Sequence, residues 1–341
     1  MTTLRRIGFA CKFSEIDAKG QVASIPELNT NGTTVTWLNR QPKDVAVQKL
    51  WDLLLGNIES TRKLIERVGN LDDNLRMVRI SSDILPVYTH SDWSWFWRQK
   101  DVQDVASREF GRVGRLARDR NVRISFHPGQ FTVLASDNPL IVDRSIEEFE
   151  YHADMARWMG FGQQFQDMKI NVHIAGRLGA QGIIDVYSRL SPEARNCITI
   201  ENEEMKHGLD DCLVLADHNI PIVLDIHHHY IREGEYISTA DSRFKRVIDS
   251  WRGLRPTIHY SVSREDYLVN HRTDILPDHA QLLAEGYKKS KLRAHSDFYW
   301  NTACNDWALT FLEHADIMCE VKSKNLGSFS LYNRAKELGL V

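Results

Sequence analysis

Short runs of apolar, strand-forming residues recur along the chain, and longer segments with the apolar spacing of amphipathic helices lie between them. The runs that we expect to form strands are residues 7–10, 77–81, 123–127, 169–173, 198–201, 222–225, 257–259 and 317–320. Strands that alternate with helices pair in parallel through right-handed crossovers. Eight such units predict an α/β protein with a closed (β/α)8 TIM barrel, and a doubly wound open sheet is the competing architecture.

The expected helical segments are residues 45–68, 105–119, 146–158, 183–190, 209–217, 244–251, 278–288, 308–314 and 331–338. Two stretches do not follow the alternation. Residues 11–44 are expected to form a long loop after the first strand. Trp93, Trp95 and Trp97 stand at alternate positions, a spacing typical of a short strand with one aromatic face. Such rings mostly pack against a core, and base stacking in a loop at the barrel face is the alternative.

Composition narrows the class of protein. With 341 residues and 42% hydrophobic content, the chain can bury a large core. No low-complexity segment or Pro/Ser-rich linker divides it, so we predict one domain over residues 1–341. The five cysteines include no C-x-x-C pair, which argues against a disulfide scaffold and a zinc ribbon. Because no signal-like start and no apolar run of 18 residues is present, we expect a soluble cytoplasmic protein with no membrane partner.

The charge balance is close to neutral. A net charge of -3 does not indicate a nucleic-acid binder, but binding to a phosphate backbone depends on local patches and bound metals. One basic span is present, comprising Arg98, Lys100, Arg108, Arg112, Arg115, Arg118, Arg120 and Arg123. It is equally consistent with a solvated helix face and with a phosphate-binding surface.

A histidine or a carboxylate ends six of the predicted strands. These residues are His127, His173, Glu201, Asp225, His259 and Glu320. The carboxyl ends of parallel strands in a closed barrel lie on one face, where side chains converge. Imidazoles and carboxylates are suitable ligands for several divalent metal ions. The pattern therefore predicts a metal-dependent barrel enzyme.

The sequence around two of these positions indicates more detailed roles. After His127, Pro128-Gly129 favours a turn that fixes the imidazole at the strand end and projects Gln130 and Phe131 outward. Glu201 can bridge two metals because each of its carboxylate oxygens can bind one ion.

The run Asp225-Ile226-His227-His228-His229 is denser in ligands. An aspartate at a strand end and a histidine three residues later can reach two neighbouring metals through one turn. Further along, Lys322 follows Glu320 by two residues and is either a surface lysine or a phosphate contact. The chain has no G-x-S-x-G, Walker A or G-x-G-x-x-G pattern, so serine hydrolase, P-loop and Rossmann functions lack support.

Taken in order along the chain, these motifs resemble the ultraviolet damage endonuclease family. The resemblance covers roughly residues 7–335 and rests on eight stretches. They are residues 79–82 with 89–90, 126–131, 171–174, 201–204, 225–228, 258–261, 294–297 and 320–324. This family is similar in fold to apurinic endonuclease IV, a barrel of the xylose-isomerase-like type with a cluster of three metals.

The resemblance implies a DNA repair enzyme that incises damaged double-stranded DNA immediately 5′ to cyclobutane pyrimidine dimers and 6-4 photoproducts. It implies metal ligands at His127, His173, Glu201, Asp225, His228, His259, His295 and Glu320. It favours His228 over His227 and His229, and it implies up to three ions, Mn²⁺ or alternatively Zn²⁺. Glu201, His90 and Lys322 are the expected catalytic residues, and Gln130 and Phe131 the lesion-probing pair. A monomer is expected.

Three positions depart from the family pattern. Thr257 stands two residues before His259, where bacterial relatives often carry a lysine that can be carboxylated, and threonine cannot carry that group. Phe9 and Phe13 stand where relatives carry a tyrosine and an asparagine near the lesion pocket. We therefore include both phenylalanines among the expected lesion contacts and leave the range of lesions open.

Three other functions compete with this one. An apurinic endonuclease of the endonuclease IV type would use the same metals on abasic DNA, which is also an additional candidate substrate here. A metal-dependent sugar isomerase would place metals at a barrel mouth, but it does not explain Gln130-Phe131 or the basic span. A non-catalytic damage binder would have little need for so many ligands.

Overall fold

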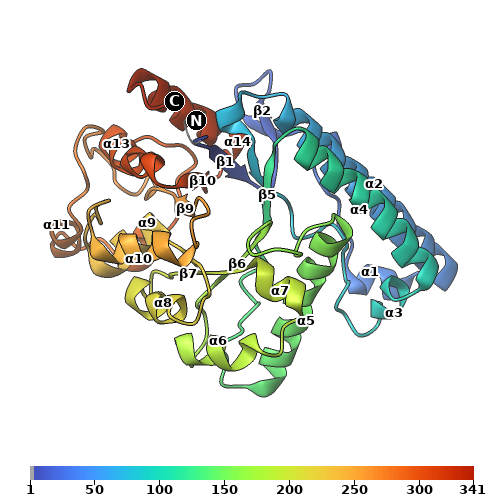
Figure 1. Cartoon of the computed structure of the whole chain (residues 1–341). Coiled ribbons are helices and arrows are strands. Elements are labelled where there is room, and N and C mark those ends of the chain that lie inside the picture. The colour runs from blue at the N-terminus through green and yellow to red at the C-terminus, as the bar shows by residue number, and fades with distance from the viewer. Residues whose placement is uncertain (1–3) are drawn as a thin grey trace.

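A closed ring of eight parallel strands forms the centre of the protein in the computed structural model, which describes residues 4–341 (Figure 1). The strands are β1 (Ile7–Ala10), β4 (Met77–Arg79), β5 (Arg123–Phe126), β6 (Lys169–His173), β7 (Ile198–Glu201), β8 (Ile222–Val223), β9 (Thr257–Tyr260) and β10 (Asp316–Cys319). Their order is β8-β7-β6-β5-β4-β1-β10-β9. An Asp225–His259 bridge, with the His259 N–H donating to the Leu224 carbonyl at 2.9 Å, joins the two outermost strands. The predicted TIM barrel is confirmed, and the open sheet is wrong.

Helices surround the barrel where the apolar spacing predicted them (Figure 1). The longer ones are α2 (Lys43–Gly69), α4 (Lys100–Asp119), α5 (Pro139–Trp158), α6 (Gly179–Tyr187), α8 (Leu209–Ala216), α10 (Ser242–Ser250), α13 (Thr302–Thr310) and α14 (Asn325–Glu337). Shorter ones are α1 (Val35–Arg40), α3 (Ser94–Trp97), α7 (Pro192–Cys197), α9 (Ile226–Glu233), α11 (His279–Ala284) and α12 (Lys289–Leu292). No helix within residues 4–341 has the length and apolar character needed to cross a membrane.

The tryptophan stretch is not a strand, so that expectation is wrong. The His90 carbonyl accepts from the N–H groups of both Trp93 and Ser94, and one helical turn, α3, follows. A strand needs a partner edge, but β4 is already paired on both sides by β1 and β5. Trp93 and Trp97 are buried as expected, whereas Trp95 is half-exposed beneath the Lys43 ammonium.

Residues 11–44 are more ordered than the expected long loop. They form an antiparallel hairpin of β2 (Ser14–Ile16) and β3 (Val22–Ser24), a short 3-10 turn at Pro26–Leu28, and α1. The buried Asn29 side chain holds the hairpin to the turn, because its amide accepts from the Phe13 N–H and donates to the Phe13 carbonyl. Three-residue strands are too short for a clear alternating pattern, which is why the sequence did not reveal them.

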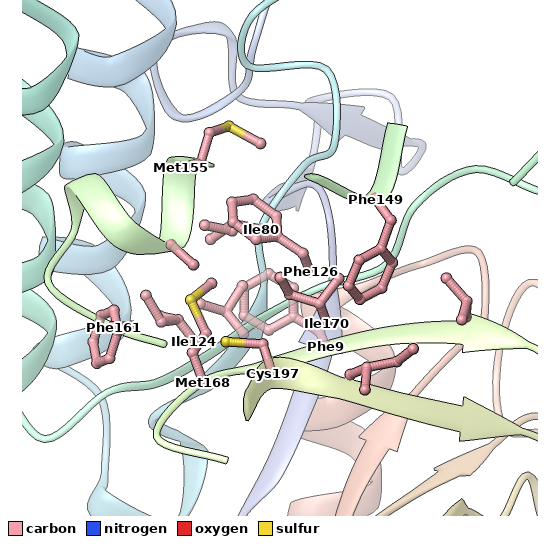
Figure 2. Packing of buried hydrophobic residues seen from close by; sticks show 14 of the residues in the cluster. Phe9, Ile80, Ile124, Phe126, Phe149, Met155, Phe161, Met168, Ile170 and Cys197 are labelled. Carbon is pink, nitrogen blue, oxygen red and sulfur yellow. The ribbon is translucent and has the colours of Figure 1, made fainter. Parts of the chain in front are cut away.

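Side chains of each barrel strand alternate between the outer helices and the barrel interior. On β1, Phe9 packs in the main apolar core, where Figure 2 shows it with Phe126 and Ile170. The neighbouring Gly8 faces inward, and a Cβ at that position would lie 2.5 Å from the Met77 carbonyl oxygen. Above this close approach, Ala10 packs with Met77 in a small interior cluster. The strands therefore project apolar side chains outward and leave the interior for other residues.

The amino end of the barrel is closed by one buried carboxylate. Asp316, at the start of β10, receives bonds of 2.7 Å from both Arg123 and Arg255 and one of 2.9 Å from the Arg6 N–H. These contacts tie β1, β5, β9 and β10 together at the end opposite the predicted metal ligands.

Candidate metal centre at the mouth of the barrel

The inward-facing positions of the strands deliver polar side chains to the carboxyl end of the barrel. Parallel pairing sets His173 beside Glu201, and the Asp225–His259 bridge sets those two side by side. His127 and Glu320 directly follow β5 and β10. All six strand-end residues therefore lie at one mouth, as the pattern predicted.

Potential ligand atoms gather in two groups that share one residue. His127, His173 and Glu201 form the first group, and Glu201, Asp225, His259 and Glu320 form the second, each with ligand atoms within 4.8 Å of one another. Glu201 Oε2 lies 3.2 Å from His127 Nε2 and 3.7 Å from His173 Nε2. Its other oxygen, Oε1, lies 3.1 Å from His259 Nδ1. The two oxygens of Glu201 thus face different groups, as a bridging ligand requires.

Three atoms of the second group are buried without a hydrogen-bond partner. They are Glu201 Oε1, Asp225 Oδ2 and His259 Nδ1. A buried polar group without a partner costs free energy, and each of these atoms can offer a lone pair. A divalent cation would satisfy all three at once. The mixed nitrogen and oxygen donors fit Mn²⁺ or Zn²⁺.

Burial keeps two of the imidazoles in the form that binds metal. It lowers the pKa of His173 to about 4 and the pKa of His259 to about 4. Both rings are therefore neutral at pH 7, with a free lone pair.

The pKa values of the two buried carboxylates, Glu201 and Asp225, are shifted in opposite directions. Burial opposes ionisation of Glu201, but the nearby histidines, His259 foremost, hold its pKa well below the usual value. Burial and then the charges of Glu201 and Glu320 raise the pKa of Asp225 well above its usual value, although His228 opposes them. Glu201 therefore favours its ionised form, whereas Asp225 favours its protonated form unless a cation offsets the neighbouring charges.

Three histidines are oriented by backbone carbonyls. Nδ1 of His127, His228 and His295 lies 2.9, 2.9 and 3.0 Å from the carbonyl oxygens of Pro128, Asn202 and Glu320. A carbonyl only accepts, so we assign a proton to Nδ1 of each ring. Burial opposes a charge on His228, but Asp225, Glu201 and Glu204 raise its pKa to about 9, so a cation at its Nε2 would have to replace a proton. His228 Nε2 then lies 3.8 Å from Asp225 Oδ2. His228 and His295 stand just outside the two groups.

Several residues of this centre were not singled out from the sequence. Arg79 pairs with Glu320, and Asn171 donates to Glu201 Oε2. Lys169 is buried, with Nζ 2.9 Å from His259 Nε2. The alternation of side chains along a strand could have identified Lys169 and Asn171, because residues 169, 171 and 173 all lie on the inner face of β6. Thr257, which the sequence did single out, is buried, and its hydroxyl has no hydrogen-bond partner.

Two of the expected catalytic residues do not enter the centre. The exposed His90 ring lines a separate cleft beside α5, and its Nδ1 accepts from the Asp92 N–H. Lys322 is exposed and its Nζ lies 3.1 Å from Asp297, because the chain turns after Glu320 instead of staying extended. Neither residue contacts the six strand-end ligands among residues 4–341.

The expected lesion contacts divide into two groups. Gln130 and Phe131 occupy the centre of a turn closed by the Thr132 N–H and the Gly129 carbonyl at 2.9 Å, and Phe131 is 85% exposed. Phe9 and Phe13 are buried, with ring centroids 5.6 Å apart. Phe9 faces the outer helices because it is an outward position of β1. The structure therefore corrects the expectation for Phe9 and Phe13, which pack the core rather than present a surface to DNA.

The basic span does not form a single surface. Arg108 and Arg112 both bond to Glu109 on the outer face of α4, and Arg118 donates to the Met159 carbonyl. Arg123 reaches Asp316 at the amino end of the barrel. These contacts favour the solvated helix face over a continuous phosphate-binding patch.

Fold and site together define a class of protein, the (β/α)8 barrels that gather histidines and carboxylates at the carboxyl ends of their strands. Comparison with known families is more specific. The chain belongs to the UV-endonuclease UvdE family, whose model matches residues 5–340.

Individual comparisons agree with this assignment. The chain is 28% identical over 306 residues to the UV-damage endonuclease of Schizosaccharomyces pombe, an alignment that covers 86% of this chain and 44% of that relative. It thus spans less than half the length of that protein. The crystal structure of SacUVDE matches 99% of this chain and all of its own, with a TM-score of 0.72 and 21% identity. Endonuclease IV from Thermus thermophilus matches 81% of this chain and 93% of its own, with a TM-score of 0.53 and 12% identity, which shows a shared fold.

Proposed function

We propose that the protein is a metal-dependent DNA repair endonuclease that incises the backbone of double-stranded DNA immediately 5′ to UV lesions. Membership of the UvdE family supports the reaction class. The proposal rests mainly on the geometry of Glu201, because its two carboxylate oxygens face two different sets of possible metal ligands. Its lesions would be cyclobutane pyrimidine dimers and 6-4 photoproducts.

We assign one ion to His127, His173 and Glu201, and a second to Glu201, Asp225, His259 and Glu320. The Nε2 atoms of His228 and His295 are available for a third, which at His228 would replace a proton. Bound ions of this kind supply a hydroxide at neutral pH and neutralise the charge that develops on the phosphate and the 3′ leaving oxygen.

The surrounding side chains prepare the ligands for this role. Asn171 donates to Glu201 Oε2, whose ionised form is favoured by the nearby histidines, His259 foremost, and Arg79 favours the ionised form of Glu320 although both carboxylates are buried. The backbone carbonyls of Pro128 and Asn202 bond to Nδ1 of His127 and His228 and so fix the orientation of both rings. The site is thus arranged before DNA arrives, which limits the reorganisation needed during the reaction.

We assign recognition of the lesion to the Gln130-Phe131 turn, which follows the ligand His127 closely in the chain. A lesion inside a duplex becomes accessible only when its bases leave the stack, and damaged bases cost less to extrude. The exposed Phe131 ring can stack in the gap, and the Gln130 amide can bond to unpaired base edges.

The test is a 5′-labelled duplex that contains one cyclobutane dimer, incubated with protein reconstituted with Mn²⁺ or with Zn²⁺. Parallel duplexes carry a 6-4 photoproduct, an abasic site or no damage. We expect one product that ends immediately 5′ to each photolesion, and no product without metal. Incision of the abasic duplex alone would replace this function with that of an apurinic endonuclease, and no incision with any metal would refute the proposal.

A further inference from the structure

A second cleft lies next to the Gln130-Phe131 turn, outside the metal centre. It has a volume of about 880 Å³, and none of the six strand-end ligands lines it. Its walls come from the loop after β4, the turn after β5 and the first half of α5. Pockets of a few hundred to about 1,000 Å³ are typical of sites that enclose a small organic ligand.

The base of the cleft is aromatic and rigid. The rings of Tyr88 and Tyr151 lie 4.6 Å apart. Tyr88 Oη donates to Asp154 at 2.8 Å, while Tyr151 Oη donates to the Ser82 carbonyl and accepts from the Leu85 N–H. Because both tyrosine hydroxyls are engaged, the rings are held in place. Tyr151 is buried beneath Tyr88, which is partly exposed and offers its apolar surface to a ligand.

Three carboxylates line the cleft against one arginine, Arg144, and the exposed His90 ring lies among them, so hydrogen-bond acceptors and negative charge predominate. Thr89 donates to Glu148 at 3.0 Å, and Asp83 and Glu147 line the same space. Burial, followed by the nearby charge of Asp83, raises the pKa of Glu148. A phosphate would be repelled by these carboxylates. A neutral ring with amino groups, such as a nucleobase, would find both a stacking surface and hydrogen-bond acceptors.

The cleft adjoins the Gln130-Phe131 turn and is linked by a hydrogen bond to a residue of the metal centre. Phe131 and Gly129 of the recognition turn form part of its lining. Ser82, another lining residue, donates to the His127 carbonyl at 2.7 Å and so joins the cleft wall to a metal ligand. The turn therefore separates the metal centre on one side from the cleft on the other.

We propose that this cleft receives an undamaged nucleobase from the strand opposite the lesion when the Phe131 turn enters the duplex. The inference rests on the proposed function and adds a second base-binding site to it. The damaged strand must place its phosphate at the metal centre. When the lesion leaves the stack, a base opposite it loses its pairing partner. Phe131 would displace that base, and Phe131 lines the cleft. Stacking against Tyr88 then stabilises the opened duplex.

The test is a double-mutant cycle between the cleft and the opposing base. Ile141 lines the cleft and Leu140, its neighbour in α5, is 70% exposed and does not. Ile141→Trp fills the cleft, and Leu140→Trp is the matched control. The kcat/KM for incision of a dimer-containing duplex is measured with adenines opposite the dimer and with a base-free propyl spacer in their place.

We expect Ile141→Trp to lower kcat/KM on the order of tenfold on the duplex with opposing adenines and to leave the spacer duplex unaffected. Leu140→Trp should change neither. An equal loss on both duplexes would overturn the inference, since the cleft would then hold something other than the opposing base. No loss on either duplex would overturn it as well. If the unaltered protein incises neither duplex, the proposed function fails and this inference fails with it.

Discussion

At the scale of single residues, Glu201 has the position expected of a ligand shared by two cations. It is completely buried, and its Oε1 lies 3.1 Å from His259 Nδ1 but has no hydrogen-bond partner. Asp225 adds a second buried carboxylate whose Oδ2 has no hydrogen-bond partner. An isolated pair of buried carboxylates of this kind would be destabilising, and a bound cation would offset that cost.

We predict that Glu201→Gln abolishes incision and leaves the fold largely intact. The substitution removes one negative charge from a ligand shared by two ion sites, so both should weaken together, while the apolar outer layer still holds the barrel. Incision rate, metal content and circular dichroism measure the three consequences. Incision retained within about tenfold, or roughly 1.4 kcal/mol of activation free energy, would contradict the bridging role.

A second residue, His152, should control stability in acid. It is buried in α5 against Phe126, and burial lowers its pKa to about 4 from an ordinary value of 6.5. Between these two values the unfolded chain binds a proton that the folded chain excludes, so stability is lost as the pH falls through this window. We predict that His152→Leu reduces the loss of unfolding free energy between pH 7 and pH 5 by about 2 kcal/mol.

Urea unfolding at the two pH values measures this effect. His218→Leu, at an exposed position, serves as the control and should leave the loss unchanged. If His152→Leu and the unaltered protein lose the same stability between these pH values, His152 is not the titrating group.

At the scale of elements, the sequence predicted the repeating units well and their connections poorly. All eight strands were found because each is an apolar run that packs on both faces. The hairpin of β2 and β3 and the helical turn α3 were missed, because three- or four-residue elements depend on partners far away in sequence. Asp316 shows this dependence, since its three arginine contacts come from β1, β5 and the loop before β9.

We predict that Asp316→Asn lowers the free energy of unfolding by about 3 kcal/mol, because Arg123 and Arg255 would lose their charged partner at a buried position. Incision per folded molecule should be unchanged, since Asp316 lies at the amino end of the barrel. Asp306→Asn breaks a more exposed pair with Arg334 and should cost less than about 1 kcal/mol. Equal costs for the two variants would show that the buried cluster does not hold the strands together.

For the recognition turn, we predict that replacing both Gln130 and Phe131 with alanine weakens binding to dimer-containing duplex by about 1–3 kcal/mol. Metal content should not change, because neither side chain is a ligand. Affinity for damaged and undamaged duplexes, measured together with bound metal, tests both statements. An unchanged preference for damage would remove the turn from recognition, and lost metal would mean that the turn supports the site.

At the scale of the whole molecule, the barrel brings together six residues that can act as ligands and that the sequence spreads over nearly 200 residues. Their gathering at one mouth was predictable, since it follows from the parallel topology. The burial of Phe9 and Phe13 and the exposed position of Lys322 were not, because they depend on which face of a strand a residue occupies and where the strand ends. The roles of His90 and Lys322 in catalysis remain predictions.

The central claim is that metal held around Glu201 cuts DNA beside UV damage. The most direct measurement is nicking of irradiated and undamaged supercoiled plasmid by purified protein, first stripped with a chelator and then restored with Mn²⁺, with Glu201→Gln beside it. We predict nicks only in irradiated plasmid, only after metal is restored, and none with Glu201→Gln. Equal nicking of both plasmids, or nicking by the stripped protein, would contradict the claim.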